Sequence, residues 1–161
     1  MKNEIIIFED QNVKLEVNMQ DETVWLSLEQ MAQLFDRDRT VITRHINNVF
    51  KSHELNKDEV CAKFAHTTEH GAIQGKTQTR KLNYYNLDMI ISVGYRVNSK
   101  QGIIFRKWAS KILKDYMIKG FALNDERLKN NGASPYFEEL LARIRDIRSS
   151  EKFFWRKVLD I

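Results

Sequence analysis

The sequence predicts an α+β fold with two small β-hairpins, helix-turn-helix-like helix pairs and a helical C-terminal extension. Apolar and polar residues alternate over residues 13–19, a pattern typical of strands with one buried face, and further extended runs follow at 23–26, 61–65 and 82–85. Apolar residues recur every three or four positions after Ser27, after Asn86 and within residues 137–147, a pattern typical of helices. We therefore expect residues 1–121 to form one α+β domain and residues 122–161 to form a helical extension.

The first hairpin and the first helix pair are expected within residues 13–50. Apolar residues alternate over 13–19, and a polar turn separates them from a second extended run at 23–26. Ser27 and Gln30 have the spacing of a capping box, so a helix is expected to begin there. The polar residues 36–39 interrupt the helical pattern, and we expect Thr40 to cap a second helix.

A second hairpin and a second helix pair are expected within residues 60–120. The two extended segments flank a stretch rich in Thr, Gly and His, which predicts a long mobile loop. Asn86 is expected to cap the first helix, and a polar turn is expected over 98–102. The helix expected over 103–119 has an apolar face that includes Trp108, Ile112 and Tyr116, and Gly120 is expected to end it.

The extension is predicted to contain helices joined by short polar segments. Asn124 is expected to cap a short helix, and residues 130–132 are expected to form a linker. Pro135 is expected in the first turn of a longer helix, and Ser150 is expected to cap a further segment. An apolar stripe supplies the candidate oligomer interface, namely Phe137, Leu140, Leu141, Ile144, Ile147, Phe154 and Trp155. Because the sequence ends in apolar residues without a helix stop, it indicates either a truncated longer protein or a helix that packs on another chain.

The formal net charge of +4 is unevenly distributed. Residues 1–35 sum to −5, residues 36–75 to 0, residues 76–120 to +8 and residues 121–161 to +1. A polyanion is therefore the first partner to expect, and double-stranded DNA is the obvious one. The candidate phosphate contacts are Arg39, Arg80, Arg96, Lys100, Arg106, Lys107, Lys111 and Lys114. A solvated helix face is the alternative explanation of such a basic segment.

The residues from Leu28 to Ile46 fit the helix-turn-helix template in part. Ala32 supplies the small residue that lets two helices cross closely, but Asp36 stands where Gly is preferred and Arg37 where an aliphatic side chain is usual. The outward residues of the second helix are the candidate base readers, namely Thr40, Thr43, Arg44, Asn47, Asn48 and Lys51. Arg suits guanine and Asn suits adenine in the major groove. An ordinary helical hairpin with a polar face is the alternative.

Other classes of protein and site find little support in the sequence. Cys61 with His66, His70 and the nearby His53 lacks the paired spacing of a zinc site, so we expect no metal. Gly75-Lys76-Thr77 lacks the first glycine of a phosphate-binding loop, no carboxylate pair is placed for catalysis, and we expect neither a cofactor nor an enzyme. A lone cysteine and the absence of a long apolar run favour a cytoplasmic protein that does not enter membranes.

Three stretches resemble a known family. They are Val24-Trp25-Leu26-Ser27-Leu28-Glu29-Gln30-Met31-Ala32-Gln33-Leu34-Phe35, Tyr84-Tyr85-Asn86-Leu87-Asp88-Met89-Ile90-Ile91-Ser92-Val93-Gly94-Tyr95-Arg96-Val97 and Phe105-Arg106-Lys107-Trp108-Ala109. They look like the RhuM family of bacterial virulence-associated and mobile-island proteins, over nearly the whole chain, although members of that family are usually longer. The order of elements is also similar to the BRO-N and KilA-N domains of phage antirepressors. The resemblance implies DNA binding or regulation and brings no catalytic residues.

Two classes of function follow from these observations. The first is a DNA-binding regulator of a bacterial mobile or virulence island that reads duplex DNA with a helix-turn-helix-like element and a basic helix. The second is a protein-interaction or oligomerisation module that acts with a partner encoded alongside it and does not read DNA. A homodimer is compatible with both, since two-fold symmetry lengthens the footprint of a small reader on DNA.

Overall fold

The computed structural model describes residues 3–4, 16–20, 23–69, 77–130 and 135–159. Its strands are β1 (Asn3–Glu4), β2 (Glu16–Gln20), β3 (Thr23–Ser27), β4 (Cys61–Glu69) and β5 (Thr77–Tyr85). Its helices are α1 (Leu28–Phe35), α2 (Arg39–Lys51), α3 (Lys57–Val60), α4 (Leu87–Arg96), α5 (Lys100–Lys119), α6 (Asp125–Asn130) and α7 (Pro135–Leu159). The α+β prediction is confirmed, and the chain divides into two compact units, Met1–Lys114 and Asp115–Ile161.

Both expected hairpins form, and they join into one antiparallel sheet with the strand order β1-β2-β3-β5-β4. The link between them is short: β3 pairs with β5 at Leu26 opposite Tyr85 and at Ser27 opposite Tyr84. The sequence pattern did not predict this link, because pairing between distant strands depends on tertiary packing. Of the expected hairpin segments, residues 13–15 and the loop over 70–76 lie outside the described residues.

The first helix pair begins as expected. The backbone N–H of Gln30 donates to Ser27 Oγ over 3.2 Å, and the backbone N–H of Ser27 donates to Gln30 Oε1 over 2.9 Å, which completes the capping box. Asp36 ends α1 with a φ of 49°, the left-handed conformation for which this position prefers Gly. The expected cap at Thr40 is wrong, because Asp38 Oδ1 accepts from the Thr40 backbone N–H over 2.8 Å and so caps α2.

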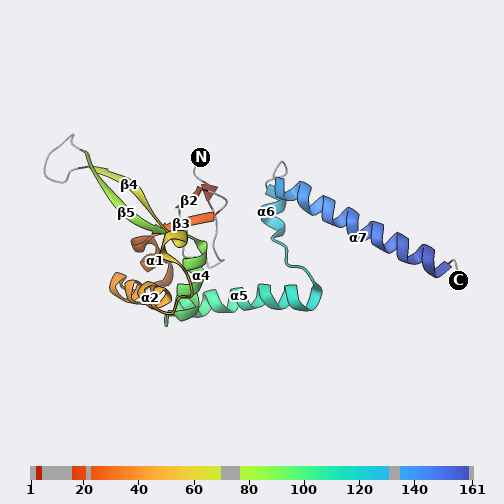
Figure 1. The fold of residues 1–161 in the computed structure, drawn as a ribbon, viewed down its shortest axis with the longest axis horizontal. Helices are drawn as coiled ribbons and strands as arrows, with labels where there is room; N and C mark the ends of the chain where they lie inside the picture. The colour runs from red at the N-terminus through yellow and green to blue at the C-terminus, as the bar shows by residue number, and fades with distance from the viewer. Residues whose placement is uncertain (1–2, 5–15, 21–22, 70–76, 131–134, 160–161) are drawn as a thin grey trace. The chain divides into compact units, whose positions relative to one another are not determined.

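The core lies where α1, α2 and α4 meet β3 and the base of the β4–β5 hairpin (Figure 1). Its buried apolar side chains are Val24, Leu26, Met31, Leu34, Phe35, Ile42, Ile46, Val49, Val60, Met89, Ile90, Val93, Val97 and Phe105. The strands and the helices each contribute one apolar face to it, in accord with the two periods in the sequence. The short α3, which the sequence analysis did not predict, adds Val60 to this core.

The second helix pair is joined by a tighter turn than expected. Asn86 caps α4 as predicted, since its Oδ1 accepts from the backbone N–H of Met89 over 3.2 Å. The expected turn over 98–102 is wrong at its end: Ser99 Oγ accepts from the backbone N–H of Gly102 over 2.9 Å, so α5 already begins at Lys100. Gly102 is needed there, because a Cβ on it would lie 2.6 Å from the Val97 carbonyl oxygen.

The second unit contains the end of α5, α6 and α7. Gly120 ends α5 with a φ of 81°, as predicted, and Asn124 accepts from the backbone N–H of Arg127 over 3.0 Å at the start of α6. The expected break at Ser150 is wrong, because α7 continues through it and the Ser150 hydroxyl donates to the Asp146 carbonyl one turn back. Of the expected linker, residues 131–132 lie outside the described residues.

We predict that Gly94→Ala destabilises the first unit. A Cβ on Gly94 would lie 2.6 Å from Cδ1 of the buried Phe105 ring, so overpacking should cost about 1–3 kcal/mol, outweighing the gain of about 1 kcal/mol in helix propensity. Urea unfolding measures the change in the free energy of unfolding. In a Phe105→Leu background the same substitution should cost less, and equal costs in both backgrounds would contradict the contact.

Candidate nucleic-acid interface

The candidate base readers lie together on one exposed face of α2. Ile42, Ile46 and Val49 on the opposite face of this helix are buried against the core. The six exposed candidates are Thr40, Thr43, Arg44, Asn47, Asn48 and Lys51. Helical spacing thus separates a core-facing side from a polar side, and the polar side is open along the whole helix.

The six side chains differ in what they can still donate. The Thr40 hydroxyl donates to Asp38 Oδ1 over 2.7 Å, and the Thr43 hydroxyl donates to the Arg39 carbonyl over 2.8 Å. Within the described part of the chain, Arg44, Asn47, Asn48 and Lys51 make no side-chain hydrogen bond or ion pair. The four residues from the middle to the end of α2 therefore keep their donors available for a ligand.

The two helix pairs meet at their turns. Arg37, in the turn between α1 and α2, donates a hydrogen bond from its guanidinium to the carbonyl of Asn98, in the turn between α4 and α5. From the sequence, Arg37 was identified only as a departure from the helix-turn-helix template. Its role depends on a carbonyl 61 positions away, which no local pattern reveals.

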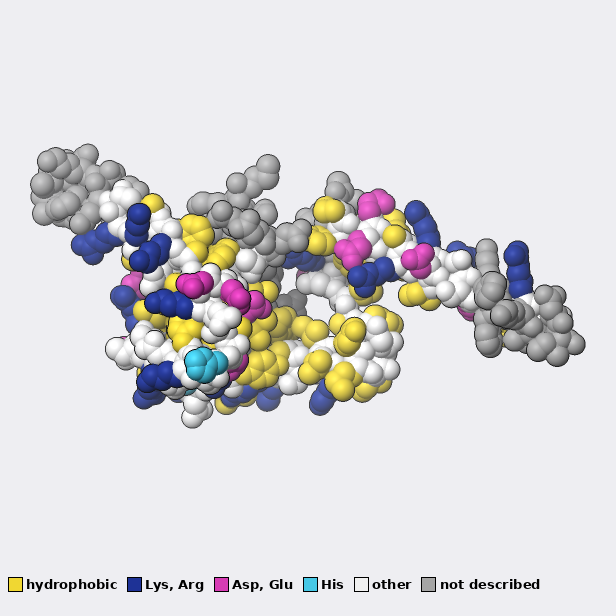
Figure 2. Space-filling view, in the orientation of Figure 1, with side chains coloured by type: hydrophobic (Ala, Val, Ile, Leu, Met, Phe, Trp, Pro, Cys, Tyr) yellow, Lys and Arg dark blue, Asp and Glu magenta, His cyan; other side chains and the backbone are white. Residues whose placement is uncertain are grey.

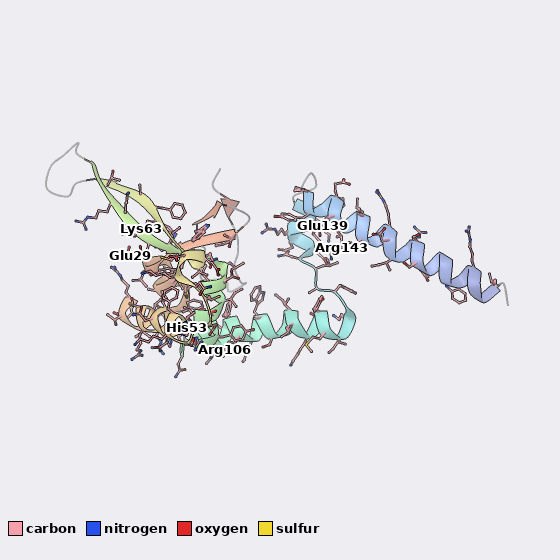
Figure 3. All side chains as sticks on the ribbon, in the orientation of Figure 1. Glu29, His53, Lys63, Arg106, Glu139 and Arg143 are labelled. Atoms are coloured by element: carbon pink, nitrogen blue, oxygen red, sulfur yellow. The ribbon has the colours of Figure 1, made fainter. Side chains whose placement is uncertain are left out.

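Three of the candidate phosphate contacts already have partners in the protein. Arg106 lies at the start of α5 (Figure 3) and donates to the carbonyls of Val97 over 2.8 Å and Gly94 over 3.2 Å. These carbonyls belong to the C-terminal end of α4, where a cation is also favoured by the helix dipole. Arg106 is therefore a bridge between the two helices.

The other two partnered candidates form ion pairs. Arg96 pairs with Glu54, and Arg39 pairs with Glu29 over 3.1 Å. The hydrogen bond from Ser92 and the one from Arg96 lower the pKa of the Glu54 carboxyl, so this carboxyl is ionised at neutral pH. The Arg39–Glu29 pair is largely exposed, and such pairs are weak enough for a phosphate to compete.

The remaining phosphate candidates are exposed lysines and one arginine. They are Arg80 on β5, Lys100 at the start of α5, and Lys107, Lys111 and Lys114 farther along α5. The predicted apolar face of α5 packs on the core only as far as Trp108; farther along the helix, Ile112 and Tyr116 are 39% and 61% exposed. The lysines are thus on a helix of which only the first turns contact the core of the first unit.

Histidine and cysteine add little charge or reactivity to this surface. Burial lowers the pKa of His45, and the neighbouring Arg44 and Arg96 lower it further, so the positive charge beside α2 at neutral pH comes from Arg and Lys. Burial raises the pKa of the Cys61 thiol, which decreases its thiolate fraction. No cluster of three metal-ligating side chains occurs among the described residues.

Comparison with known proteins assigns the family. A model described as the virulence protein RhuM family matches residues 59–161, which is more than half of the chain. The chain belongs to the RhuM family. The match runs from the end of α3 through α7 and is thus shorter than the nearly full length expected from the sequence; α1 and α2 lie before it.

The other comparisons found nothing similar to this RhuM-family protein. No curated protein and no solved structure matched the chain. Among the described residues, no helix is both long and apolar enough to cross a membrane.

We predict that Arg106→Gln destabilises the fold whereas Lys107→Gln does not. The first substitution removes the charged donor from two carbonyls at the end of α4, which should cost about 1–2 kcal/mol, whereas Lys107 is exposed on the next position of the same helix. Urea unfolding of the two charge-matched variants makes the comparison. Equal stability of both variants would show that Arg106 does not bridge the helices.

Proposed function

We propose that this RhuM-family protein is a cytoplasmic DNA-binding regulator of a bacterial mobile or virulence island, in which α2 enters the major groove of duplex DNA. The observation that carries the proposal is the polar face of α2, which is exposed over its full length while the opposite face is buried. An α-helix fits the major groove when one side is free of the protein body and carries hydrogen-bonding side chains. The order of elements, which from the sequence resembles that of BRO-N and KilA-N domains, also implies DNA binding, and this resemblance stays a prediction.

The residue types on α2 suit the two tasks of a recognition helix. Arg44 is suited to a bidentate contact with guanine, and Asn47 or Asn48 is suited to a contact with adenine. Lys51 at the C-terminal end and Arg39 at the N-terminal end are suited to phosphates on either side of the groove. The exposed lysines of α5 are the further backbone contacts. The proposal assigns no catalysis, metal or cofactor to the protein.

We predict that Arg44→Ala and Lys111→Ala impair DNA binding in different ways. Arg44→Ala should relax the preference at one base position and cost about 1–3 kcal/mol on the preferred duplex. Lys111→Ala should weaken binding to all duplexes about equally and reduce the salt slope by about 1. Selection of preferred duplexes from a random library by the unaltered protein, followed by affinity measurements against salt, provides both readouts.

Two outcomes would contradict this function. Affinity that shows no steep fall between about 50 and 200 mM salt would exclude phosphate contacts as its source. The same uniform loss from both substitutions would remove α2 from the role of recognition helix, even if the protein binds DNA.

A second candidate function, an oligomerisation module, is favoured by the apolar stripe on α7. Ile144 and Ile147 are 48% and 70% exposed, and Trp155 farther along is 55% exposed. Phe137, Leu140 and Leu141 of the same stripe are half-buried, whereas the side chain of Phe154 lies outside the described residues. A charged pair flanks the stripe, since Arg143 pairs with Glu139 over 2.9 Å one turn earlier (Figure 3). A stripe of this kind is suited to packing on another helix, and a second copy of α7 is the simplest partner.

We predict that Ile144→Asp with Ile147→Asp dissociates a homodimer. Two carboxylates in the stripe would be buried without partners in the paired helices, which is strongly unfavourable. Ala142→Asp with Ser149→Asp is the matched control, because both residues are exposed on the other side of α7 and carry the same charge change. Sedimentation equilibrium distinguishes the species. A monomeric unaltered protein, or a dimer that survives the stripe substitutions, would exclude this interface.

A further inference from the structure

The β4–β5 hairpin extends well past the rest of the sheet. Its strands pair over nine positions, from Cys61 opposite Tyr85 to Glu69 opposite Thr77. Of the β5 positions, β3 pairs only with Tyr84 and Tyr85, so the seven positions from 77 to 83 have a neighbour on one side only. At about 3.4 Å per residue, this two-stranded ribbon reaches roughly 24 Å beyond β3. Figure 1 shows it leaving the core as an arm.

Aromatic contacts at the base set the direction of the ribbon. The Phe64 ring packs edge-to-face on Tyr84 at a centroid distance of 5.2 Å and on Trp25 of β3 at 5.7 Å. Because successive residues of a strand alternate between faces, Leu82 and Arg80 lie on the same side as Phe64. This side is thus apolar at the base and joins the ribbon firmly to the sheet.

The other side of the ribbon is basic and polar. Lys63 lies opposite Asn83, and Ala65 lies opposite Lys81, so the two lysines are diagonal neighbours on one face, and all four residues are exposed. The segments of the ribbon whose side chains are described, 61–65 and 79–85, contain three cations and no carboxylate. Glu69, the one acidic residue of the two strands, stands at the far end of β4.

We propose that this ribbon is a second DNA-contacting element, which lays Lys63 and Lys81 along the phosphate backbone beside the groove that α2 enters. The inference rests on the proposed function of α2. Lysine is a typical phosphate ligand, and a two-stranded ribbon is narrow enough to lie along or in a DNA groove. Figure 2 shows Lys and Arg side chains along the side of the first unit that carries the ribbon, α1 and α2. An extended ribbon whose face lacks carboxylates fits a continuous polyanion better than it fits a compact ligand.

The test compares Lys63→Gln/Lys81→Gln with a charge-matched control in the full chain. The control is Arg127→Gln/Lys129→Gln on α6, where both residues are exposed. Affinity for a random-sequence duplex is measured at several salt concentrations. If each ribbon lysine neutralises one phosphate, the double variant should lower the slope of log affinity against log salt by about 1.8. The control should leave the slope unchanged, and Lys63→Arg/Lys81→Arg should retain the slope of the unaltered protein.

The outcomes separate this inference from the proposed function. If the unaltered protein binds duplex DNA and Arg44→Ala weakens that binding, but the ribbon variant keeps the full salt slope, α2 remains the reader and the ribbon is excluded. Absence of salt-dependent binding by the unaltered protein overturns both.

A second measurement does not depend on the folding of a variant. Duplex DNA should protect Lys63 and Lys81 of the unaltered protein from chemical acetylation and should leave Lys129 reactive. Equal protection by polyglutamate would indicate an acidic protein partner and overturn the assignment to DNA.

Discussion

The close contact between Gly94 of α4 and Phe105 of α5 is the constraint on which the first unit depends. The Phe105 ring occupies the space that any side chain at position 94 would take, and it packs edge-to-face on Phe35 of α1 at a centroid distance of 5.8 Å. Three helices therefore meet at one ring. Because this contact holds the first turns of α5 against α4, the guanidinium of Arg106 reaches the carbonyls at the end of α4. Its hydrogen bonds to them link the two helices.

The distribution of charge over these helices shows why net charge alone does not locate a binding surface. Three arginines of the first unit already have partners within it: Arg37 and Arg106 donate to carbonyls at the turns, and Arg96 pairs with Glu54. Arginine suits these positions because its planar group makes several directed hydrogen bonds at once. Lys81, Lys100, Lys107, Lys111 and Lys114 are exposed, so part of the +8 charge of residues 76–120 stabilises the fold and part is available to a partner.

Local features of the fold could be predicted from the sequence, and features set by distant contacts could not. The caps at Ser27 and Asn86 and the exposed face of α2 follow from spacing within a few residues. The pairing of β3 with β5 and the bond between Arg37 and Asn98 join segments about 60 residues apart, and no periodicity encodes them. The prediction of a helix break at Ser150 was wrong for a related reason. A serine hydroxyl can either cap the start of a helix or donate to a carbonyl one turn back within a helix, and the sequence does not distinguish the two.

The order of elements in the first unit repeats, and the repeat explains how one surface can collect polar side chains from distant segments. A hairpin leads directly into a capped helix, a three-residue turn and a second helix, once from β2 to α2 and again from β4 to α5. The central strands of the two repeats pair at Ser27 and Tyr84, and their turns touch through Arg37 and Asn98. The second helices of both repeats consequently begin beside the same junction. The two repeats differ in the polar surface that they expose. The first exposes the polar face of α2, and the second exposes the β4–β5 ribbon and the lysines of α5.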